Sequence, residues 1–519
     1  MFYTVKMKAN ELWWGGSNSD GNLMPFSCDS NLQRDFRKNA PNETMPFYVS
    51  NLGRIIWCEE PFAVEIKDGI FTFEANSEIK VLNGGATLRE GFLFARKHLF
   101  PTDKRVLNRD FFKTVQYNTW IECLYHPTQS HVLKYAHDII ENGFEPGILM
   151  IDEGWHGRYG NWDFDKYAFP DPKAMVDELH KLGFKVLLWV VPAVCPDGEF
   201  FIEHLRKSNN EHANEPENYL FLRTKDAPER PALFHWWNGY SALLNMKSES
   251  NRLFLDNQLQ HLMNTYGIDG FKFDGGNIDF YSQSITGEVL GDHTPAELNI
   301  AWNTFAAKYD YHEYKDTFKG ASLNTIQRLS DRFHLWQNGL DTVIPQSLAQ
   351  GIIGHPFVCP DMVGGGEWTC FTEGKEIDGE LFVRWAQCSA LFPMMQYSKA
   401  PWSCLKKQDC DLVLAAGKLH TKFTNELIEM VEKAEQSGEP IVRYMEYNYP
   451  NQSYAKITDQ FMLWDKYLVA PVIEKGARKR RVVIPKGCWL ADDGSTYQEG
   501  TYEIDCPINR LPYFKKISD

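Results

Sequence analysis

Between residues 110 and 438, short apolar runs alternate with longer runs that have the spacing of amphipathic helices. For example, GILMIDEGW (147–155) precedes the helical run PKAMVDELHKLG (172–183). The candidate strands are TVQYNTW (114–120), GILMIDEGW, KVLLWVVPAV (185–194), GFKFDGG (270–276), KGASLN (319–324), IQRLSD (326–331), HPFVCPDMVGGG (355–366) and LFPMMQYS (391–398). Eight strands in β–α alternation predict an α/β fold of the (β/α)8 or TIM-barrel type. A doubly wound open sheet is the alternative, but no glycine-rich phosphate fingerprint follows the first strand.

Both flanks of this segment have a different texture. The N-terminal stretch GRIIWCEEPFAVEIKDGIFTFEA (53–75) alternates around a Lys-Asp-Gly turn, as a β-hairpin does. Strand-like runs return in QFMLWDKYLVAPVI (460–473) and KRRVVIPKGCWL (479–490). We therefore predict an N-terminal β-sandwich-like domain (1–108), a catalytic barrel (109–438) and a small C-terminal antiparallel β domain (439–519). The length of 519 residues agrees with this division, because a single core rarely grows beyond about 250–300 residues.

Charge and cysteine content exclude several classes of partner. The formal net charge of −15 argues against nucleic acid or an anionic membrane as a partner, since both need a basic surface. The 11 cysteines are scattered without a CxxC pair, which favours reduced thiols over a disulfide framework or a zinc site. The N-terminus lacks the apolar segment of a secretory signal. We expect a cytoplasmic protein, or a periplasmic or secreted one whose signal peptide has been removed; a homo-oligomer is left open.

The predicted strands end in polar side chains, and in a (β/α)8 barrel these ends face the active site. Asp274 ends an apolar run and is followed by Gly275 and Gly276, which we expect to leave open space beside it. Asp274 could instead cap the next helix or form a turn. The other polar or aromatic residues at predicted strand ends are Asp152, Glu153, Trp189, Arg328, Asp331 and Asp361. Their number favours an active site, although we expect Glu153 to face a helix.

Several acids, an arginine and tryptophans suit glycoside hydrolysis. Its oxocarbenium-like transition state needs one ionised carboxylate and one protonated carboxyl. No GxSxG nucleophile elbow is present. Asp152, Asp274 and Asp361 could instead hold a divalent cation, but no HxH, HExxH or DxD pair lies at these strand ends, and Trp189 and Arg328 would be unusual neighbours for it. We expect no metal and no cofactor. A catalytically inactive sugar-binding protein is a further alternative.

Several segments resemble glycoside hydrolase family 31. GFKFDGGN (270–277) resembles its nucleophile segment, and IQRLSDRFHLW (326–336) its acid/base segment. HPFVCPDMVGGG and ELFVRWAQCSALFPMMQYS (380–398) resemble its seventh and eighth strands, and IVRYMEYNYP (441–450) its following β domain. WWGG (13–16) and IDEGW (151–155) are similar to the branch that contains the myogenesis-regulating glycosidase and bacterial α-galactosidases.

The resemblance implies a retaining enzyme that acts on α-glycosidic bonds without a cofactor. It implies Asp274 as the nucleophile and Asp331 as the general acid/base. The substrate-binding residues that it implies are Asp152, Trp120, Trp189, Lys272, Arg328, Asp361 and Gln396. We expect Asp274 to be ionised with the help of Lys272, and Asp331 to be protonated at rest.

Two departures from the family's glucosidase pattern bear on the sugar. The Arg-x-His that usually follows strand 8 is replaced by Gln396-Tyr397-Ser398, and Gly276-Asn277 stand where an acid is usual. Both favour an exo-acting α-galactosidase whose substrate is a terminal α-linked oligosaccharide or glycoside. An α-glucosidase, α-xylosidase or α-N-acetylgalactosaminidase stays open. The charged insertion at 195–245, with Trp236-Trp237, is a candidate part of the pocket rim.

Overall fold

The computed structural model describes residues 1–211, 219–282, 284–289 and 293–518, and the side chains of 206–211 are not considered. Within these ranges, eight parallel strands form the central sheet in the order β19-β18-β16-β15-β11-β10-β9-β20. They are β9 (Gln116–Asn118), β10 (Ile148–Ile151), β11 (Lys185–Val190), β15 (Gly270–Phe273), β16 (Tyr311–Tyr314), β18 (Gln327–Arg328), β19 (Val358–Cys359) and β20 (Gln396–Tyr397). An isolated parallel bridge between Met362 and Gln396 joins the two ends of the sheet. The predicted (β/α)8 barrel is confirmed.

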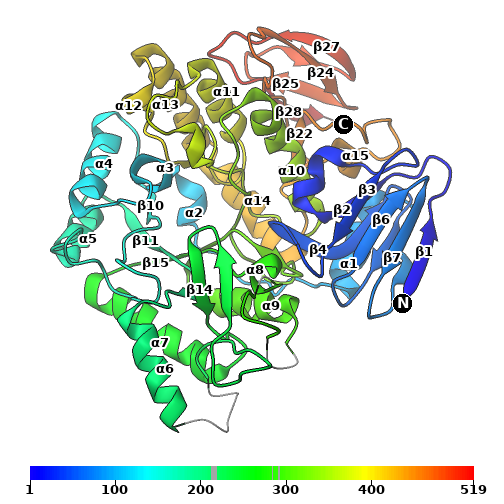
Figure 1. Ribbon diagram of the computed structural model, residues 1–519. Helices are drawn as coiled ribbons and strands as arrows, with labels where there is room; N and C mark the ends of the chain where they lie inside the picture. The colour runs from blue at the N-terminus through cyan, green and yellow to red at the C-terminus, as the bar shows by residue number, and fades with distance from the viewer. Residues whose placement is uncertain (212–218, 283, 290–292, 519) are drawn as a thin grey trace.

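Helices surround the barrel, with ends set by local sequence (Figure 1). The longer ones are α4 (Gln129–Glu141), α5 (Pro172–Lys181), α7 (Glu249–Tyr266), α9 (Pro295–Ala306), α10 (Asp341–Ile352), α11 (Gly379–Ser389), α13 (Lys407–Lys422) and α14 (Thr424–Ser437). Thr294 and Glu297 form a capping box at the start of α9, and Gly267 ends α7 in the left-handed region at φ +85°. Short helices α2 (Asp110–Lys113), α3 (Trp120–Cys123), α8 (Ile278–Ser282) and α12 (Pro401–Cys404) lie in the loops.

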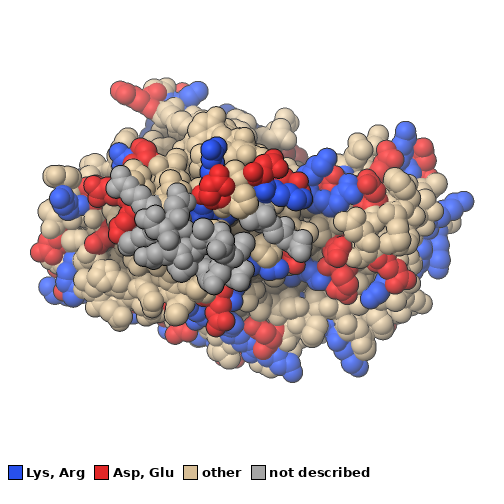
Figure 2. All heavy atoms as spheres, turned by 60° about the horizontal axis from the view of Figure 1, so that its bottom comes forward, with Lys and Arg blue, Asp and Glu red and all other residues tan. Residues whose placement is uncertain are grey.

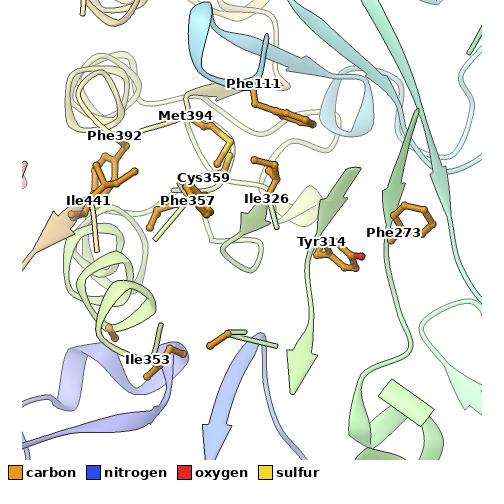
Figure 3. Close-up of a cluster of buried hydrophobic side chains, with 14 of the residues drawn as sticks. Phe111, Phe273, Tyr314, Ile326, Ile353, Phe357, Cys359, Phe392, Met394 and Ile441 are labelled. Atoms are coloured by element: carbon orange, nitrogen blue, oxygen red, sulfur yellow. The ribbon is translucent and has the colours of Figure 1, made fainter. Parts of the chain in front are cut away.

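The fifth barrel strand differs from the prediction. The structure places it at Tyr311–Tyr314, and residues 319–324 form a turn instead of a strand. The run YHEY (311–314) lacks the apolar pattern of a buried strand because His312 and Glu313 are polar. Both are nevertheless buried and hydrogen-bonded, His312 to Tyr309 O and Glu313 to Gln396. The apolar side chains of neighbouring strands form a continuous core, in which Phe273 and Tyr314 stack with ring centroids 5.8 Å apart (Figure 3).

The N-terminal residues form two sheets packed together. One has the order β1 (Phe2–Lys6), β7 (Ile70–Glu74), β6 (Ala63–Lys67), β3 (Leu32–Asp35). The other has the order β17 (Thr317–Phe318), β4 (Glu43–Ser50), β5 (Arg54–Trp57), β8 (Lys80–Asn83), with β2 (Trp13–Ser17) beside β4. Helix α1 (Leu88–His98) follows, and the 3-10 helix η1 (Asn18–Leu23) links β2 to β3. Strand β17 belongs to the loop between β16 and β18, so the barrel contributes a strand to the N-terminal domain.

The C-terminal residues form an antiparallel sheet and a separate pair of antiparallel strands. The sheet has the order β21 (Val442–Arg443), β22 (Phe461–Leu463), β23 (Tyr467–Val469), β28 (Tyr513–Ser518), β25 (Cys488–Ala491), β26 (Thr496–Tyr497). The pair is β24 (Lys479–Ile484) with β27 (Gly500–Asp505), and the short helix α15 (Met445–Asn448) precedes β22. Trp14 lies 5.8 Å from Tyr444 between ring centroids, so the N- and C-terminal sheets adjoin on one side of the barrel (Figure 1).

The insertion after β11 forms a small antiparallel sheet. It contains β12 (Ala193–Val194), β13 (Leu233–Trp236) and β14 (Gly239–Leu243), and helix α6 (Glu199–Glu211) lies between β12 and β13 in the chain. Residues 212–218 of this insertion lie outside the described residues. Among the helices of the described ranges, none has the length and apolar character needed to cross a bilayer. Figure 2 shows acidic and basic side chains interspersed over one face of the molecule, so this face does not present a field of one sign.

Candidate active site

A pocket of about 220 Å³ lies at the carboxyl end of the barrel strands. Its lining residues are Trp120, Tyr125, Asp152, Glu153, Trp189, Trp237, Lys272, Asp274, Lys315, Asp331, Glu367 and Trp368. Of the predicted site residues, the structure brings Asp274, Asp331, Asp152, Trp120, Trp189 and Lys272 together here. The volume is below the ~300–1,000 Å³ of pockets that hold drug-sized ligands, so the pocket suits one small unit.

Asp274 follows β15 directly and is held by two donors. Trp189 Nε1 donates to Asp274 Oδ2 at 2.9 Å, and the Gly275 amide donates to Oδ1 at 2.8 Å. Burial raises the pKa of Asp274, but the positive charges of Lys315 and Lys272 outweigh burial and leave the pKa below its ordinary value. Asp274 is therefore ionised at neutral pH, as expected from the sequence.

The two glycines after Asp274 do not leave open space, which corrects the prediction. A Cβ on Gly275 would lie 2.7 Å from Val191, and one on Gly276 would lie 2.7 Å from Trp302. Both glycines also have positive φ, at +62° and +71°. They allow a left-handed turn in close contact with neighbouring side chains, and that turn aims Asp274 into the pocket.

Asp331 lies between two cations. Lys315 Nζ is 2.7 Å from Asp331 Oδ2, and an Arg328 guanidinium nitrogen is 3.0 Å from Oδ1. Burial raises the pKa of Asp331, but Lys315 and Arg328 together hold it well below its ordinary value. The expectation that Asp331 is protonated at rest is therefore wrong. The sequence did not indicate Lys315, because the fifth strand that places it was assigned to the wrong residues.

Asp152 and Lys272 form a buried ion pair on one wall of the pocket. Lys272 Nζ lies 2.7 Å from Asp152 Oδ2, and both side chains are almost fully buried. Asp152 follows β10, and Lys272 is on β15, two strands away across the barrel end. Asp152 Oδ1 accepts the Glu153 amide at 2.9 Å. Each carboxylate oxygen can accept more than one hydrogen bond, so Asp152 and the remaining Lys272 protons can bind a polar ligand such as a sugar hydroxyl.

Arg328, Asp361 and Gln396 lie behind the pocket and do not line it. Arg328 is fully buried and pairs with Asp361 at 2.6 Å and with Glu313 at 3.4 Å. Asp361 Oδ2 accepts the Arg332 amide at 2.9 Å, and Gln396 Nε2 donates to Glu313 at 2.9 Å. Among the described residues, Arg328 Nη2 and Gln396 Oε1 have no hydrogen-bond partner, so the contact of these three residues with substrate stays a prediction. Their geometry fits a role in holding the loop of Asp331.

Glu153 faces the pocket and not a helix, which is a further correction. Its Oε1 accepts hydrogen bonds from the Tyr159 hydroxyl and from Asn238 Nδ2. Burial raises the pKa of Glu153 to about 7, with the Asp152 and Asp274 carboxylates adding to the rise and the Tyr159 hydrogen bond opposing it. The backbone of this loop turns at Gly154, at φ +99°, after Asp152 and Glu153 have both been directed inward.

Aromatic side chains line the entrance. Trp237 belongs to the insertion that we predicted as part of the rim, whereas Tyr125 and Trp368 were not predicted. Trp237 is 51% exposed and Trp368 is 37% exposed, and the Tyr125 ring lies 6.4 Å from that of Trp368. Trp237 and Asn238 form the turn between β13 and β14, and Asn238 also donates to the Tyr159 hydroxyl at 2.7 Å. The insertion therefore contributes to the pocket rim, which Glu367 completes.

Among the described residues, no group of three or more His, Cys, Asp and Glu side chains is arranged to hold a metal ion. Asp152 pairs with Lys272, Asp274 accepts from Trp189, and Asp361 pairs with Arg328. The carboxylates considered for a cation are thus each directed at a different donor of the protein. This donor set fits hydrogen bonding to hydroxyl groups better than coordination of one ion.

An eight-stranded parallel barrel with carboxyl groups and aromatic walls at its carboxyl end is the arrangement of a barrel glycosidase. Residues 113–409 match the glycosyl hydrolases family 31 TIM-barrel domain, and residues 438–517 match the glycosyl hydrolase family 31 C-terminal domain. The chain therefore belongs to glycoside hydrolase family 31.

The chain is similar to several proteins of that family with different names. It is 30% identical over 437 residues to the myogenesis-regulating glycosidase of Mus musculus, covering 80% of this chain and 58% of that one. It is 24% identical over 520 residues to alpha-xylosidase XylQ of Lactiplantibacillus pentosus, covering 90% and 62%. The Flavobacterium johnsoniae GH31 dextranase FjDex31A in complex with glucose has the same fold, with a TM-score of 0.81, 17% identity, and 99% and 66% coverage. The chain spans less than two thirds of the length of these two curated relatives.

Proposed function

We propose that this protein is a retaining, exo-acting α-glycosidase that removes terminal α-galactosyl units. The observation that carries the proposal is that Asp274 and Asp331 both line one small pocket with aromatic walls. A retaining mechanism uses two such carboxyls, one as nucleophile and one as acid/base. The small volume supports cleavage of one terminal sugar at a time.

In the first step, an Asp274 oxygen forms a bond to the anomeric carbon while the glycosidic C–O bond breaks. Asp331 gives its proton to the departing oxygen. In the second step, water attacks the anomeric carbon, transfers a proton to Asp331, and releases Asp274 as carboxylate. Trp189 holds the nucleophile in one orientation throughout, through its hydrogen bond of 2.9 Å.

Asp331 has to acquire its proton when the substrate binds. Lys315 holds it ionised in the empty pocket. A sugar that enters between the two side chains and excludes water weakens this ion pair, and burial then raises the pKa of Asp331. Once Asp274 has become an ester, Lys315 is left with Asp331 as its remaining carboxylate partner in the pocket. Asp331 then loses its proton more readily and is ready to act as a base.

The sugar specificity rests on residues after strands 4 and 8. Ser398 stands at the place of the sugar-contacting histidine of the glucosidase pattern, and its hydroxyl accepts the Ile121 amide at 2.7 Å. Gln396 stands at the place of the arginine and donates to Glu313. Gly276 and Asn277 stand where an acid is usual, and neither they nor Asp279, which accepts from Asn277, are among the residues that line the pocket. Galactose differs from glucose in an axial O4, and a site with rearranged partners rejects the epimer because polar groups stay unpaired.

The charges of the pocket support a neutral sugar over a sulfonated or carboxylated one. Lys272 and Lys315 are the cations among its described lining residues, and each is paired with a carboxylate. The lining carboxylates are Asp152, Glu153, Asp274, Asp331 and Glu367. An anionic substrate would meet an excess of negative charge without a free cation to balance it.

The test is hydrolysis of aryl α-glycosides with galacto, gluco, xylo and N-acetylgalactosamino configurations, by the wild type and Asp274→Asn. We expect turnover of the α-galactoside alone, loss in the variant, and α-galactose as the first product by NMR. Turnover of a different sugar instead would refute the galactose assignment, and a β-product would refute retention. No turnover of any glycoside by a folded wild type would favour a sugar-binding protein.

A further inference from the structure

We propose that Asn42, on the N-terminal sheet domain, is a positioning residue for the acid/base Asp331 and its partner Lys315. The inference rests on the proposed function, because it assigns Asp331 the proton transfer. Asn42 lies directly before β4, the strand that pairs with β17 from the barrel loop. It is 2% exposed and does not line the pocket.

The Asn42 amide bonds to both loops that carry the charged pair. Its Oδ1 accepts the amide proton of Ser330, which directly precedes Asp331, at 3.1 Å. Its Nδ2 donates to the carbonyl oxygen of Arg328 at 3.1 Å and to the carbonyl oxygen of Lys315. One side chain thus joins the backbone at Lys315 to the backbone on the N-terminal side of Asp331.

The Asn42 side chain joins the two chains beyond the point where the hydrogen bonds between β16 and β18 end. Strands β16 and β18 are paired through Tyr314 and Gln327, and the register ends there. Lys315 and Asp331 both lie beyond this pair, where the two chains leave the ladder. Because Asn42 offers a donor and an acceptor together, its amide serves both chains in the way that a backbone peptide group would.

Asn42 is itself held from several sides. Asn18 Nδ2 donates to its Oδ1 at 2.7 Å, and its own backbone amide donates to Asp316 Oδ1 at 3.0 Å. The Thr317 amide donates to its carbonyl at 3.0 Å, next to the parallel pairing of β17 with β4. Its φ of +50° is in the left-handed region, which asparagine tolerates better than most residues. The amide is therefore fixed before it meets the loops.

The consequence concerns the proton transfer and not sugar binding. A general acid has to lie within hydrogen-bond reach of the leaving oxygen, and misplacement by about 1 Å can cost on the order of 10²-fold. Without the Asn42 amide, the loops of Lys315 and Asp331 lose their shared anchor. Reactions that need the proton should slow, whereas a leaving group that departs without a proton should be much less affected.

The test compares Asn42→Ala with the wild type on methyl α-galactoside and on α-galactosyl fluoride, whose fluoride leaves without a proton. We expect kcat/KM for the methyl glycoside to fall roughly 10- to 100-fold and that for the fluoride to change less than about 3-fold. Asn42→Gly, which suits the positive φ, should behave in the same way and serves if the alanine variant does not fold. Asn42→Asp, which keeps the acceptor for Ser330 but loses both donors, should also slow the methyl glycoside selectively.

Asn51→Ala is the matched control. Asn51 is a buried asparagine of the same domain, and its amide bonds to Leu12 N at 2.9 Å and Asn10 O at 3.4 Å, away from the barrel loops. We expect it to change both substrates by the same factor. An equal loss on both substrates in the Asn42 variants, or no loss on either, overturns the inference. A wild type inactive on the fluoride would instead overturn the proposed function.

Discussion

The Nζ atom of Lys315 lies 2.7 Å from Oδ2 of Asp331, and the same lysine lowers the pKa of Asp274. One cation thus acts on both carboxyls of the pocket. In the empty pocket it keeps both of them ionised, although the proposed chemistry needs one to be protonated. Lys315 is therefore the residue whose removal should report most directly on how the pair titrates.

The first prediction concerns Lys315→Met. The kcat/KM profile rises as Asp274 ionises and falls as Asp331 loses its proton. Because Lys315 lowers the pKa of both carboxyls, its removal raises both pKa values, and both limbs of the profile move to higher pH. The measurement is kcat/KM for an aryl α-galactoside from about pH 2 to pH 7, because both carboxyls have pKa values below their ordinary value in the wild type. Lys319→Met, which removes a lysine paired with Glu59 outside the pocket, should leave the profile in place. A profile that is the same in both variants would contradict the role given to Lys315.

The second prediction separates the two carboxyls. Asp331→Ala should lose about 10²- to 10⁴-fold in kcat/KM on methyl α-galactoside but far less on α-galactosyl fluoride. Added azide should restore turnover and give α-galactosyl azide, because the covalent intermediate still forms. Asp274→Ala should be inactive on both, and azide should give the β-azide from the α-fluoride by direct displacement. NMR of the azide products decides the assignment, and reversed anomers would exchange the two roles.

The third prediction concerns stability and Glu153. Its folded pKa of about 7 lies above its ordinary value of 4.5, so the native state binds more protons than the unfolded state between these pH values. Stability therefore falls as pH rises through this window, by up to about 3 kcal/mol. Glu153→Gln removes the charge and keeps an acceptor for Tyr159 and Asn238. Its Tm should match the wild type at pH 4.5 and exceed it at pH 8.5, measured by thermal melting. The exposed Glu60→Gln should show no such pH-dependent gain.

The fourth prediction concerns the leaving group. Trp237 lies at the rim and offers an exposed ring face to the part of the substrate outside the pocket. Trp237→Ala should raise KM for an α-galactosyl disaccharide roughly 3- to 10-fold and leave α-galactosyl fluoride unaffected, because stacking of this kind contributes about 0.5–1.5 kcal/mol. Tyr240→Ala, an equally exposed aromatic of the same hairpin that does not line the pocket, is the control. Equal effects on disaccharide and fluoride would place Trp237 outside the leaving-group path.

Much of the site could be predicted from the rule that residues at the carboxyl ends of barrel strands face the active site. The rule holds because the carboxyl ends of all the parallel strands lie on the same side of the barrel. Asp152, Trp189 and Asp274 were predicted in this way, and all three line the pocket. Arg328 and Asp361 also follow the rule, but the sequence does not show that they pair with each other and are not among the residues that line the pocket. The direction in which such a side chain points depends on its contact partners. These partners are distant in the chain and are brought together only when the chain packs.

Lys315 shows where hydropathy misled the prediction. Lys315 directly follows the strand YHEY, which contains a buried histidine and a buried glutamate and therefore lacks the apolar pattern expected of a barrel strand. The polar groups are tolerated because each finds a partner in the barrel interior. Asn238 was missed, and Glu153 was expected to face a helix, for a related reason: an insertion hairpin distant in the sequence folds back onto the loop after β10.

The parallel pairing of β17 with β4 means that a boundary in the sequence near residue 108 is not a boundary for catalysis. A chimera that exchanges only the barrel between two members of the family would separate β17 from the strand with which it evolved its register. A chimera that exchanges only residues 1–108 would bring a foreign residue to the place of Asn42. In either chimera, we expect hydrolytic efficiency to be kept only where residues 42–44 and residues 315–331 come from the same parent. Such enzymes should therefore be recombined with these two segments transferred as one unit.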